Sequence, residues 1–185
     1  MRFIPEREEI AVAKVYAGVG SRETPPIILR LMEQIAVSLG NDGWVCRTGG
    51  ADGADLAFER GALRSATDPH VYLPWAGFNE DKSLCPPRMT EPEVWTLDIA
   101  AKNHPAWASL SRPVRQLMCR NVHQVLGDRA EPRHSAFVVC WTPGGKGGGG
   151  TGQAIRVARS HGIEVFDLAI TEDRMRIRTG LGLTG

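Results

Sequence analysis

The stretch SAFVVCWTPGGKGGGGTGQAIRVARSHGIEVFDL, residues 135–168, decides the fold. An apolar run ends at Pro143 in a glycine-rich loop, which leads into an amphipathic helix over about 152–161 and a second apolar run at 163–168. A strand, a glycine loop and a helix start in this order form an anion site, because the free N–H groups and positive dipole end of the helix point into the loop. Glycine also lets the backbone approach a ligand closely. A flexible solvent loop is the alternative interpretation.

The same alternation of apolar runs and helical patterns continues toward the N-terminus. Compact apolar runs predict buried strands at residues 14–19, 44–48 and 70–73. Apolar residues at helical spacing predict helices that run from an N-cap at Thr24 to Leu39, from Leu56 to about Leu63, and from Ser111 to Leu126. Strands and helices therefore alternate along most of the chain.

This alternation predicts an α/β fold, a Rossmann-like, doubly wound, mostly parallel sheet with helices on both faces. The chain of 185 residues fits a single domain, 1–185. Residues 76–110 are rich in proline and polar groups and predict a long loop or lid. The basic C-terminal tail, 171–185, predicts a short helix that frays, and the charged residues 1–12 predict an arm or an edge strand.

Three glycine-bearing loops follow predicted strands, at 18–22, 49–53 and 143–152. Right-handed crossovers place every strand-to-helix loop at the carboxyl edge of a parallel sheet. Ligands of open α/β sheets bind at that edge, where the strand order reverses. Three loops of this kind together favour a ligand site over a slack loop.

Composition indicates an ordinary globular protein rather than a membrane protein or a strongly basic nucleic-acid-binding protein. The net charge of +1 predicts neither a strongly basic nor an acidic protein, although a local patch is compatible with it. The scattered cysteines form no C-x-x-C pair, which favours reduced thiols in the cytoplasm. No signal peptide and no apolar run of membrane length is recognisable, so no membrane contact and a cytoplasmic location are expected.

Sequence motifs of several common cofactor, metal and catalytic sites are absent from the chain. The string GVGSRE lacks the third glycine of the dinucleotide fingerprint, and no Ser or Thr follows Lys146 as a P-loop requires. The histidines are isolated from other metal ligands, and no G-x-S-x-G elbow occurs. The sequence therefore predicts no metal, no cofactor, no NAD-dependent redox chemistry and no ATP hydrolysis.

Four strings carry a resemblance to a known superfamily: VYAGVGSR, TGGADGADLAFERGA, RQLMCRNVHQVLG and TPGGKGGGGTGQAIRVA. Together they resemble the SLOG superfamily of Rossmann-like proteins over about residues 14–168. That superfamily includes the DNA-processing protein A (DprA, or Smf) family and, more distantly, the LONELY GUY nucleotide phosphoribohydrolases. The likeness is greatest to short phage and bacterial DprA-like proteins.

The resemblance implies a ligand pocket built from all three loops and from one helix. Its implied residues are Gly20, Ser21 and Arg22 on the first loop, Gly49, Gly50, Asp52, Gly53 and Asp55 on the second, Arg120 and Asn121 on the helix, and Gly149, Gly150, Thr151 and Gly152, with Gln153 beside them, at a phosphate.

The residue types fit that implication, although each has a structural alternative. Arg22 and Arg120 can give bidentate, charge-assisted bonds to a phosphate, or can face solvent. Thr151 either caps the last helix of the glycine stretch or donates its hydroxyl to a ligand. Asp55 either binds ribose hydroxyls or acts as a base, or it stabilises a helix N-terminus.

One departure from the superfamily bears on catalysis. In the phosphoribohydrolases a glutamate follows the Gly-Thr pair by three residues and acts on the N-glycosidic bond, whereas this chain has Ala154 there, beside Gln153. A glutamine amide cannot take a proton as a carboxylate does. If the chain cleaves nucleotides, the carboxylate must come from Asp52, Asp55 or Glu59.

Three functions stay open on this evidence: binding, with or without cleavage, of a nucleotide or nucleotide-derived small molecule, DprA-like binding of single-stranded DNA, and a non-catalytic role toward a protein partner. The DNA alternative rests on basic residues in 102–134 and on three tryptophans nearby that can stack on bases. These residues are Lys102, Arg112, Arg115, Arg120, Arg129, Arg133, Trp75, Trp95 and Trp107. Related SLOG proteins commonly pair, so the resemblance also implies a homodimer as an assembly to test.

Overall fold

The computed structural model describes residues 14–183, so the arm or edge strand predicted at 1–12 lies outside the described residues. The strands are β1 (Lys14–Gly18), β2 (Trp44–Thr48), β3 (His70–Leu73), β4 (Arg88–Met89), β5 (Phe137–Cys140) and β6 (Glu164–Asp167). The helices are α1 (Pro26–Asn41), α2 (Ala54–Ala62), α3 (Val94–Lys102), α4 (Arg112–Leu126), α5 (Gly149–Ser160) and α6 (Thr171–Gly180).

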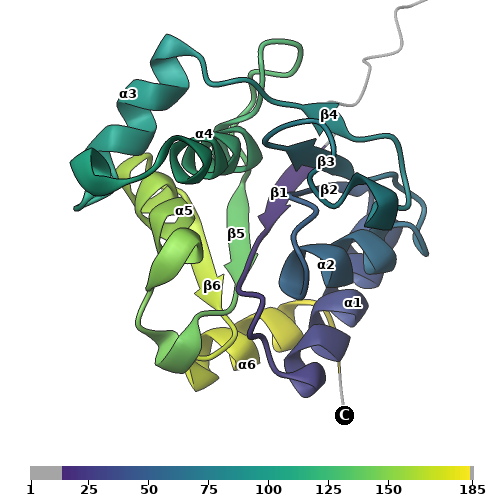
Figure 1. Ribbon diagram of the computed structural model, residues 1–185. Coiled ribbons are helices and arrows are strands. Elements are labelled where there is room, and N and C mark those ends of the chain that lie inside the picture. Colours follow the sequence, from purple (N-terminus) through teal and green to yellow (C-terminus); the bar gives the residue numbers. More distant parts are fainter. Residues whose placement is uncertain (1–13, 184–185) are drawn as a thin grey trace, which may run out of the picture.

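The described strands form one sheet in the order β4-β3-β2-β1-β5-β6, and all their pairings are parallel. The first four strands are added in one direction from β1, and β5 and β6 in the other (Figure 1). The strand order therefore reverses between β1 and β5. This topology confirms the predicted Rossmann-like α/β fold and fixes its switch point.

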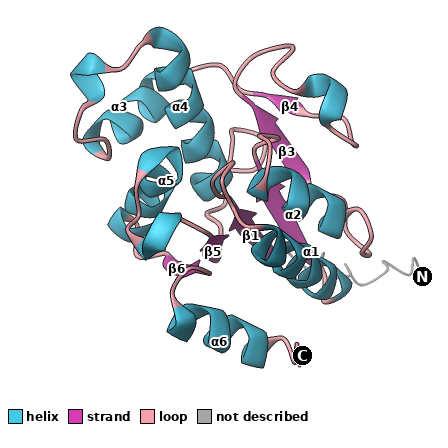
Figure 2. Cartoon of the chain, turned by 60° about the horizontal axis from the view of Figure 1, so that its bottom comes forward, coloured by secondary structure: helices cyan, strands magenta, loops and turns pink. Residues whose placement is uncertain are grey.

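Helices cover both faces of the sheet, with α1, α2 and α6 on one side and α3, α4 and α5 on the other (Figure 2). Neighbouring strand residues alternate between the two cores, as the two-residue period of a strand requires. Tyr16 packs in the core under α1 and α2, whereas Ala17 packs in the core under α4 and α5. Val139 and Val138 divide in the same way on β5.

The segment 76–110, predicted as one long loop or lid, carries regular structure over part of its length. It contains β4, α3 and 3-10 turns at Glu80–Lys82 and Trp107–Ser109. The strand is only two residues long, and α3 buries only Thr96 and Ala100 fully, so neither leaves a clear periodic pattern. The helix predicted in the tail is α6, and its first turn contains Glu172 and Asp173, which suit a helix N-terminus.

The predicted cap of α1 differs in detail. Thr24 does not cap the helix, whose N-cap position is Pro25. Its hydroxyl instead donates to the carbonyl of Ser21 at 2.7 Å, and the Glu23 amide donates to the Ser21 hydroxyl at 3.0 Å. The threonine therefore stabilises the turn after β1, which is one of the three glycine-bearing loops.

A buried polar network ties the 127–134 connection to the sheet. Arg47 on β2 is fully buried and donates to the carbonyl oxygens of Arg133 and Glu131. On the neighbouring strands, the Tyr72 hydroxyl donates to Asp128 at 3.0 Å, and Arg88 donates to the same carboxylate at 2.9 Å. These bonds hold the connection between α4 and β5 against the other half of the sheet, and thereby fix the C-terminal end of α4.

One histidine in this region makes stability depend on pH. His123 on α4 is 2% exposed and lies between the rings of Tyr72 and Trp95. Burial lowers the pKa of His123 below its ordinary 6.5. The unfolded chain therefore binds a proton first as the pH falls, so this histidine contributes stability that is complete above pH 6.5 and is lost below it.

We expect the free energy of unfolding to fall as the pH is lowered from about 7.5 to about 5.5, and His123→Phe to reduce that slope because the aromatic packing remains and the titration is removed. Urea denaturation at several pH values measures both slopes. His161→Gln, at an exposed histidine, is the control. Parallel wild-type and His123→Phe profiles would contradict the assignment.

Candidate functional site

A cavity of about 640 Å³ opens at the carboxyl ends of β1 and β5, where the strand order reverses. Residues of all three glycine-bearing loops and of α4 meet there. The predicted residues that line the cavity are Gly20, Ser21, Arg22, Asp55, Arg120, Asn121, Gly149, Gly150 and Thr151. We call this cavity the cleft.

The face of α4 that forms one wall of the cleft follows helical spacing. Leu117, Arg120, Asn121 and Gln124 all line the cavity. Residues three, four and seven positions apart lie on one side of a helix. The pair Arg120–Asn121, which the superfamily resemblance singled out, is therefore the middle of a longer row that includes two unpredicted residues.

Asp167 and Thr142 brace the glycine loop at its base. The amide and the hydroxyl of Thr142 both donate to the buried Asp167 carboxylate, at 3.1 and 2.5 Å. The Gly147 amide then donates to the Thr142 hydroxyl at 3.0 Å. A side chain at Gly152 would place its Cβ 1.8 Å from the Gly147 carbonyl oxygen, so α5 and the loop touch backbone to backbone. The loop is thus held in one shape rather than slack.

The N-terminus of α5 opens into the cleft without a side-chain cap. Its N-cap position is Gly148, which has no side chain to accept a bond, and no other cap bond is made. The first N–H groups of any helix have no partner within the helix, and they favour anions. Thr151 in the first turn lines the cleft and does not cap the helix. Of its two predicted roles, the ligand-facing one fits this geometry.

Arg120 and Asp55 form a buried ion pair in the wall of the cleft. The Arg120 Nη1 lies 3.3 Å from Asp55 Oδ2 and also donates to the carbonyl of Gly49. The Ala51 amide donates to the same carboxylate at 3.2 Å. Burial raises the pKa of Asp55, while the Arg120 charge opposes that rise. Arg120 is therefore bonded to the second loop, and its predicted contact with a phosphate stays a prediction.

Asn121 connects α4 to the glycine loop. Its amide nitrogen donates to the carbonyl of Gly150 and to the side-chain oxygen of Gln153, each at 3.1 Å. Gln153 is fully buried and does not line the cleft. Both residues fix the distance between α4 and the start of α5, and their predicted contacts with a ligand stay predictions.

The free positive charges stand at the rim. Arg22 and Lys146 line the cleft and are exposed, as is the acidic Glu23. Neither cation forms an ion pair with the described residues 14–183. They can therefore turn toward an anionic ligand at the glycine loop at no cost in broken bonds.

The predicted carboxylates do not gather as a catalytic pair. Asp52 lies outside the cavity lining and pairs with Lys82 at 2.8 Å. Glu59 is fully buried and accepts bonds from the Ser83 hydroxyl at 2.9 Å and the Leu84 amide at 2.6 Å. Only Asp55 reaches the cleft among these candidates. Across residues 14–183, no three His, Cys, Asp or Glu side chains gather as a metal site.

The remaining predicted glycines shape the loops from behind the cleft. A Cβ on Gly49 would lie 1.6 Å from Arg120 Nη1, so the glycine is what allows the arginine to cross the second loop. The Gly50 carbonyl accepts from Asn79 Nδ2 at 3.2 Å, and Gly53 takes the N-cap position of α2 with φ at +83°. Gly49, Gly50, Gly53 and Gly152 do not line the cavity.

Several lining residues escaped prediction. They are Val19, Glu23, Ala51, Phe78, Leu117, Met118, Gln124, Pro143, Lys146, Gly148 and Ala154. Lys146 was visible in the glycine loop, and the α4 residues could have been found from their helical spacing to Arg120. Phe78 carries no local signal, because only the fold of the segment after β3 brings it to the cleft.

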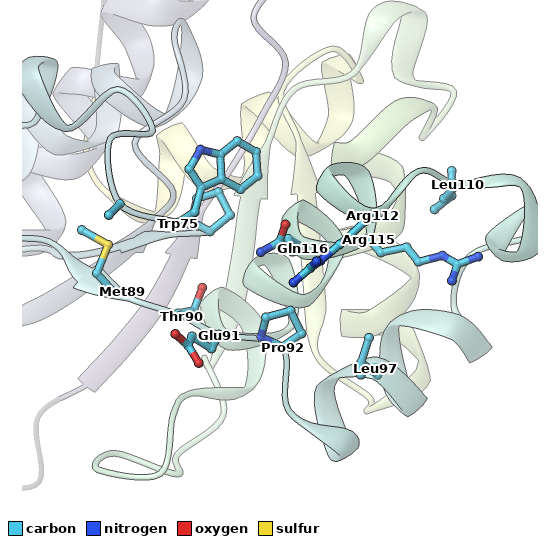
Figure 3. Close-up of a pocket in the computed structure, with 12 residues that line it drawn as sticks. Trp75, Met89, Thr90, Glu91, Pro92, Leu97, Leu110, Arg112, Arg115 and Gln116 are labelled. Atoms are coloured by element: carbon cyan, nitrogen blue, oxygen red, sulfur yellow. The ribbon is translucent and has the colours of Figure 1, made fainter.

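A second hollow of about 820 Å³ lies beside the ends of β3 and β4 (Figure 3). Its walls come from Pro74–Ala76, from 89–92, from α3 and from the first turns of α4. It holds Trp75 and Arg112, and its acidic residue is Glu91. The Trp75 ring packs edge to face against the Phe78 ring, which lines the cleft, and the two ring centres are 5.1 Å apart. Helix α4 contributes residues to both hollows.

No family model and no curated protein sequence matches this chain. A solved structure does. It is a structure of DNA processing protein A from Helicobacter pylori, described for its single-stranded DNA binding mode. The two superpose with a TM-score of 0.59 at 17% sequence identity, over 92% of this chain and 81% of that one. The chain has a DprA-like fold.

The sequence predicted no membrane contact. Within residues 14–183, every helix is too short or too polar to cross a bilayer.

Proposed function

We propose that the protein binds single-stranded DNA, with a backbone phosphate at the N-terminus of α5 and successive bases along α4. The observation that carries this proposal is that α4 contributes residues to both the cleft and the second hollow, while Trp75 of the hollow packs against Phe78 of the cleft. A free nucleotide needs only the cleft. A strand needs the neighbouring hollow as well, and that hollow supplies an aromatic face at Trp75 and a positive charge at Arg112.

The phosphate end of the proposal rests on the α5 N-terminus and the rim cations. The uncapped N–H groups favour an anion, and Arg22 and Lys146 add charge at the mouth of the cleft. The base end rests on Trp75, because stacking on an aromatic ring tolerates any base. The Helicobacter protein of similar fold, whose structure is described for its single-stranded DNA binding mode, gives independent support.

We expect Trp75→Ala to weaken binding of a short single-stranded oligonucleotide about tenfold, since one base stack contributes roughly 1–3 kcal/mol. Trp75→Phe retains a ring and should recover most of the affinity. Fluorescence polarisation of a labelled oligonucleotide measures both variants. Because Trp75 lies outside the cleft, binding of a nucleoside monophosphate should be the same in the wild type and in Trp75→Ala.

Oligonucleotide length and salt complete the test. Affinity should rise from a mononucleotide to a hexamer and then level off, and log Kd should depend on log salt with a slope of about 0.7 per phosphate contacted. A Trp75→Ala protein that binds oligonucleotides as tightly as the wild type removes the second hollow from the path. Absence of any salt-dependent oligonucleotide binding rejects the proposal.

A second candidate is binding of a free nucleotide, and the rigid glycine loop favours it. A ligand present at 100 times its Kd raises the free energy of unfolding by about 2.7 kcal/mol, so a nucleotide panel in a thermal-shift experiment tests it. Release of free base in the same panel tests cleavage of the N-glycosidic bond. Of the carboxylates predicted for such cleavage, Asp55 lines the cleft, and its carboxylate is paired with Arg120.

A further inference from the structure

Gln124 presents a polar group to the cleft that none of the residues in 14–183 satisfies. The residue is 1% exposed and lines the cavity from α4. Neither its side-chain oxygen nor its side-chain nitrogen has a hydrogen-bond partner among the described residues. Its main chain is fixed, because the carbonyl accepts from the buried Ser135 hydroxyl at 2.9 Å.

An amide left unpaired in this position destabilises the folded protein. Buried polar side chains nearly always have hydrogen-bond partners. A side chain without one gives up its hydrogen bonds to water and gains none in the protein. A leucine of similar size would fill the space without that cost. The unsatisfied amide of Gln124 therefore points to a partner that arrives from outside the chain.

The neighbours of Gln124 in the cleft have the character of a base pocket. Phe78 is 9% exposed and offers a ring, and Leu117 offers an apolar wall. The Arg120 guanidinium carbon lies 6.0 Å from the centre of the Phe78 ring, and no acceptor among the described residues binds the Arg120 Nε–H. A flat apolar wall with a few unpaired donors and one acceptor suits a planar heterocycle with a polar edge.

We propose that Gln124 binds the edge of one nucleobase inserted into the cleft and so makes the site selective for that base. The inference rests on the proposed function and adds base specificity to it. A glutamine amide places a donor beside an acceptor, and its usual bidentate partner is adenine, through N6 and N7. The phosphate contacts at α5 carry no such information, because every nucleotide has the same backbone.

The experiment compares hexamers of deoxyadenosine, deoxycytidine and thymidine on the wild type and on Gln124→Leu. We expect the wild type to prefer one of the three, adenine by the common pairing, by about tenfold. Gln124→Leu should bind all three alike, at the level of the weaker ligands, with the salt dependence of binding unchanged. Gln124→Met provides a second uncharged variant of similar length.

The controls separate a role in recognition from one in folding. Gln34→Leu makes the same change at an exposed site on α1 and should leave the preference intact. The melting temperature of Gln124→Leu should equal or exceed that of the wild type, because an unsatisfied amide is removed. A clear fall in melting temperature would mark Gln124 as structural and overturn the proposal.

The outcomes also separate this inference from the proposed function. Salt-dependent binding of all hexamers, with equal affinities in the wild type or with ratios that Gln124→Leu does not change, overturns base recognition and leaves DNA binding standing. Loss of affinity for all hexamers by the same factor in Gln124→Leu also overturns it. Failure of the wild type to bind any hexamer removes the proposed function and this inference together.

Discussion

Thr151→Asp is expected to lower the affinity for a single-stranded oligonucleotide by on the order of a thousandfold. Thr151 lines the cleft in the first turn of α5, beside the proposed phosphate position. Two like charges about 4 Å apart near a protein surface repel by about 4 kcal/mol, which corresponds to about three factors of ten in Kd. The loss should shrink at high salt, since salt screens exposed charges.

The same substitution should not damage the fold. An aspartate in the first turn of a helix interacts favourably with the helix dipole, by about 0.3–1 kcal/mol, so the melting temperature should hold or rise. Thr151→Ser should bind like the wild type, and Asn41→Asp adds the same charge at the exposed end of α1 as a control. Retained affinity in Thr151→Asp would remove the α5 N-terminus from the site.

Arg120→Met should lower the free energy of unfolding by about 3–5 kcal/mol, the usual loss when one partner of a buried ion pair is removed. The methionine fills much of the same volume, but the Asp55 carboxylate, whose side chain is only 4% exposed in the wild type, loses its cation. It also frees the Gly49 carbonyl that Arg120 now satisfies. Urea denaturation followed by two spectroscopic probes measures the loss and checks that unfolding stays cooperative.

The double variant Arg120→Met, Asp55→Asn tests the cause. Removing both charges should restore about half or more of the lost stability, because the unpaired carboxylate is then gone. A single variant that loses less than about 1 kcal/mol would mean that the pair is hydrated rather than buried. A double variant no more stable than the single one would assign the loss to packing instead of charge.

The fold was predictable because each strand carries its own signal. The segments 15–19 and 44–46 are apolar, as strands covered on both faces tend to be, and glycines follow both strands. The resulting order of strands and helices permits few topologies. β4 escaped because two residues have no periodicity, and α3 because its half-buried side chains give it only a weak stripe.

The candidate site was predictable in outline and not in its internal bonds. The three loops could be placed on one edge from strand direction alone. The sequence could not predict whether Arg120 faces a ligand or pairs with Asp55. The two residues are 65 positions apart, and only the packing of α4 against the second loop brings them together. The brace between Thr142 and Asp167 and the unpaired amide of Gln124 depend on side-chain geometry in the same way.

The pairing of β1 with β5 has a consequence for how the protein holds together. It matches Ala17 with Val138 and Gly18 with Val139, a shorter run than β1 forms with β2 or β5 forms with β6. The cleft opens directly above this pairing, with the first two loops on one side of it and the glycine loop on the other. A bound strand that contacts loops on both sides would therefore bridge this short pairing, and occupancy would raise the free energy needed to separate the two parts of the sheet.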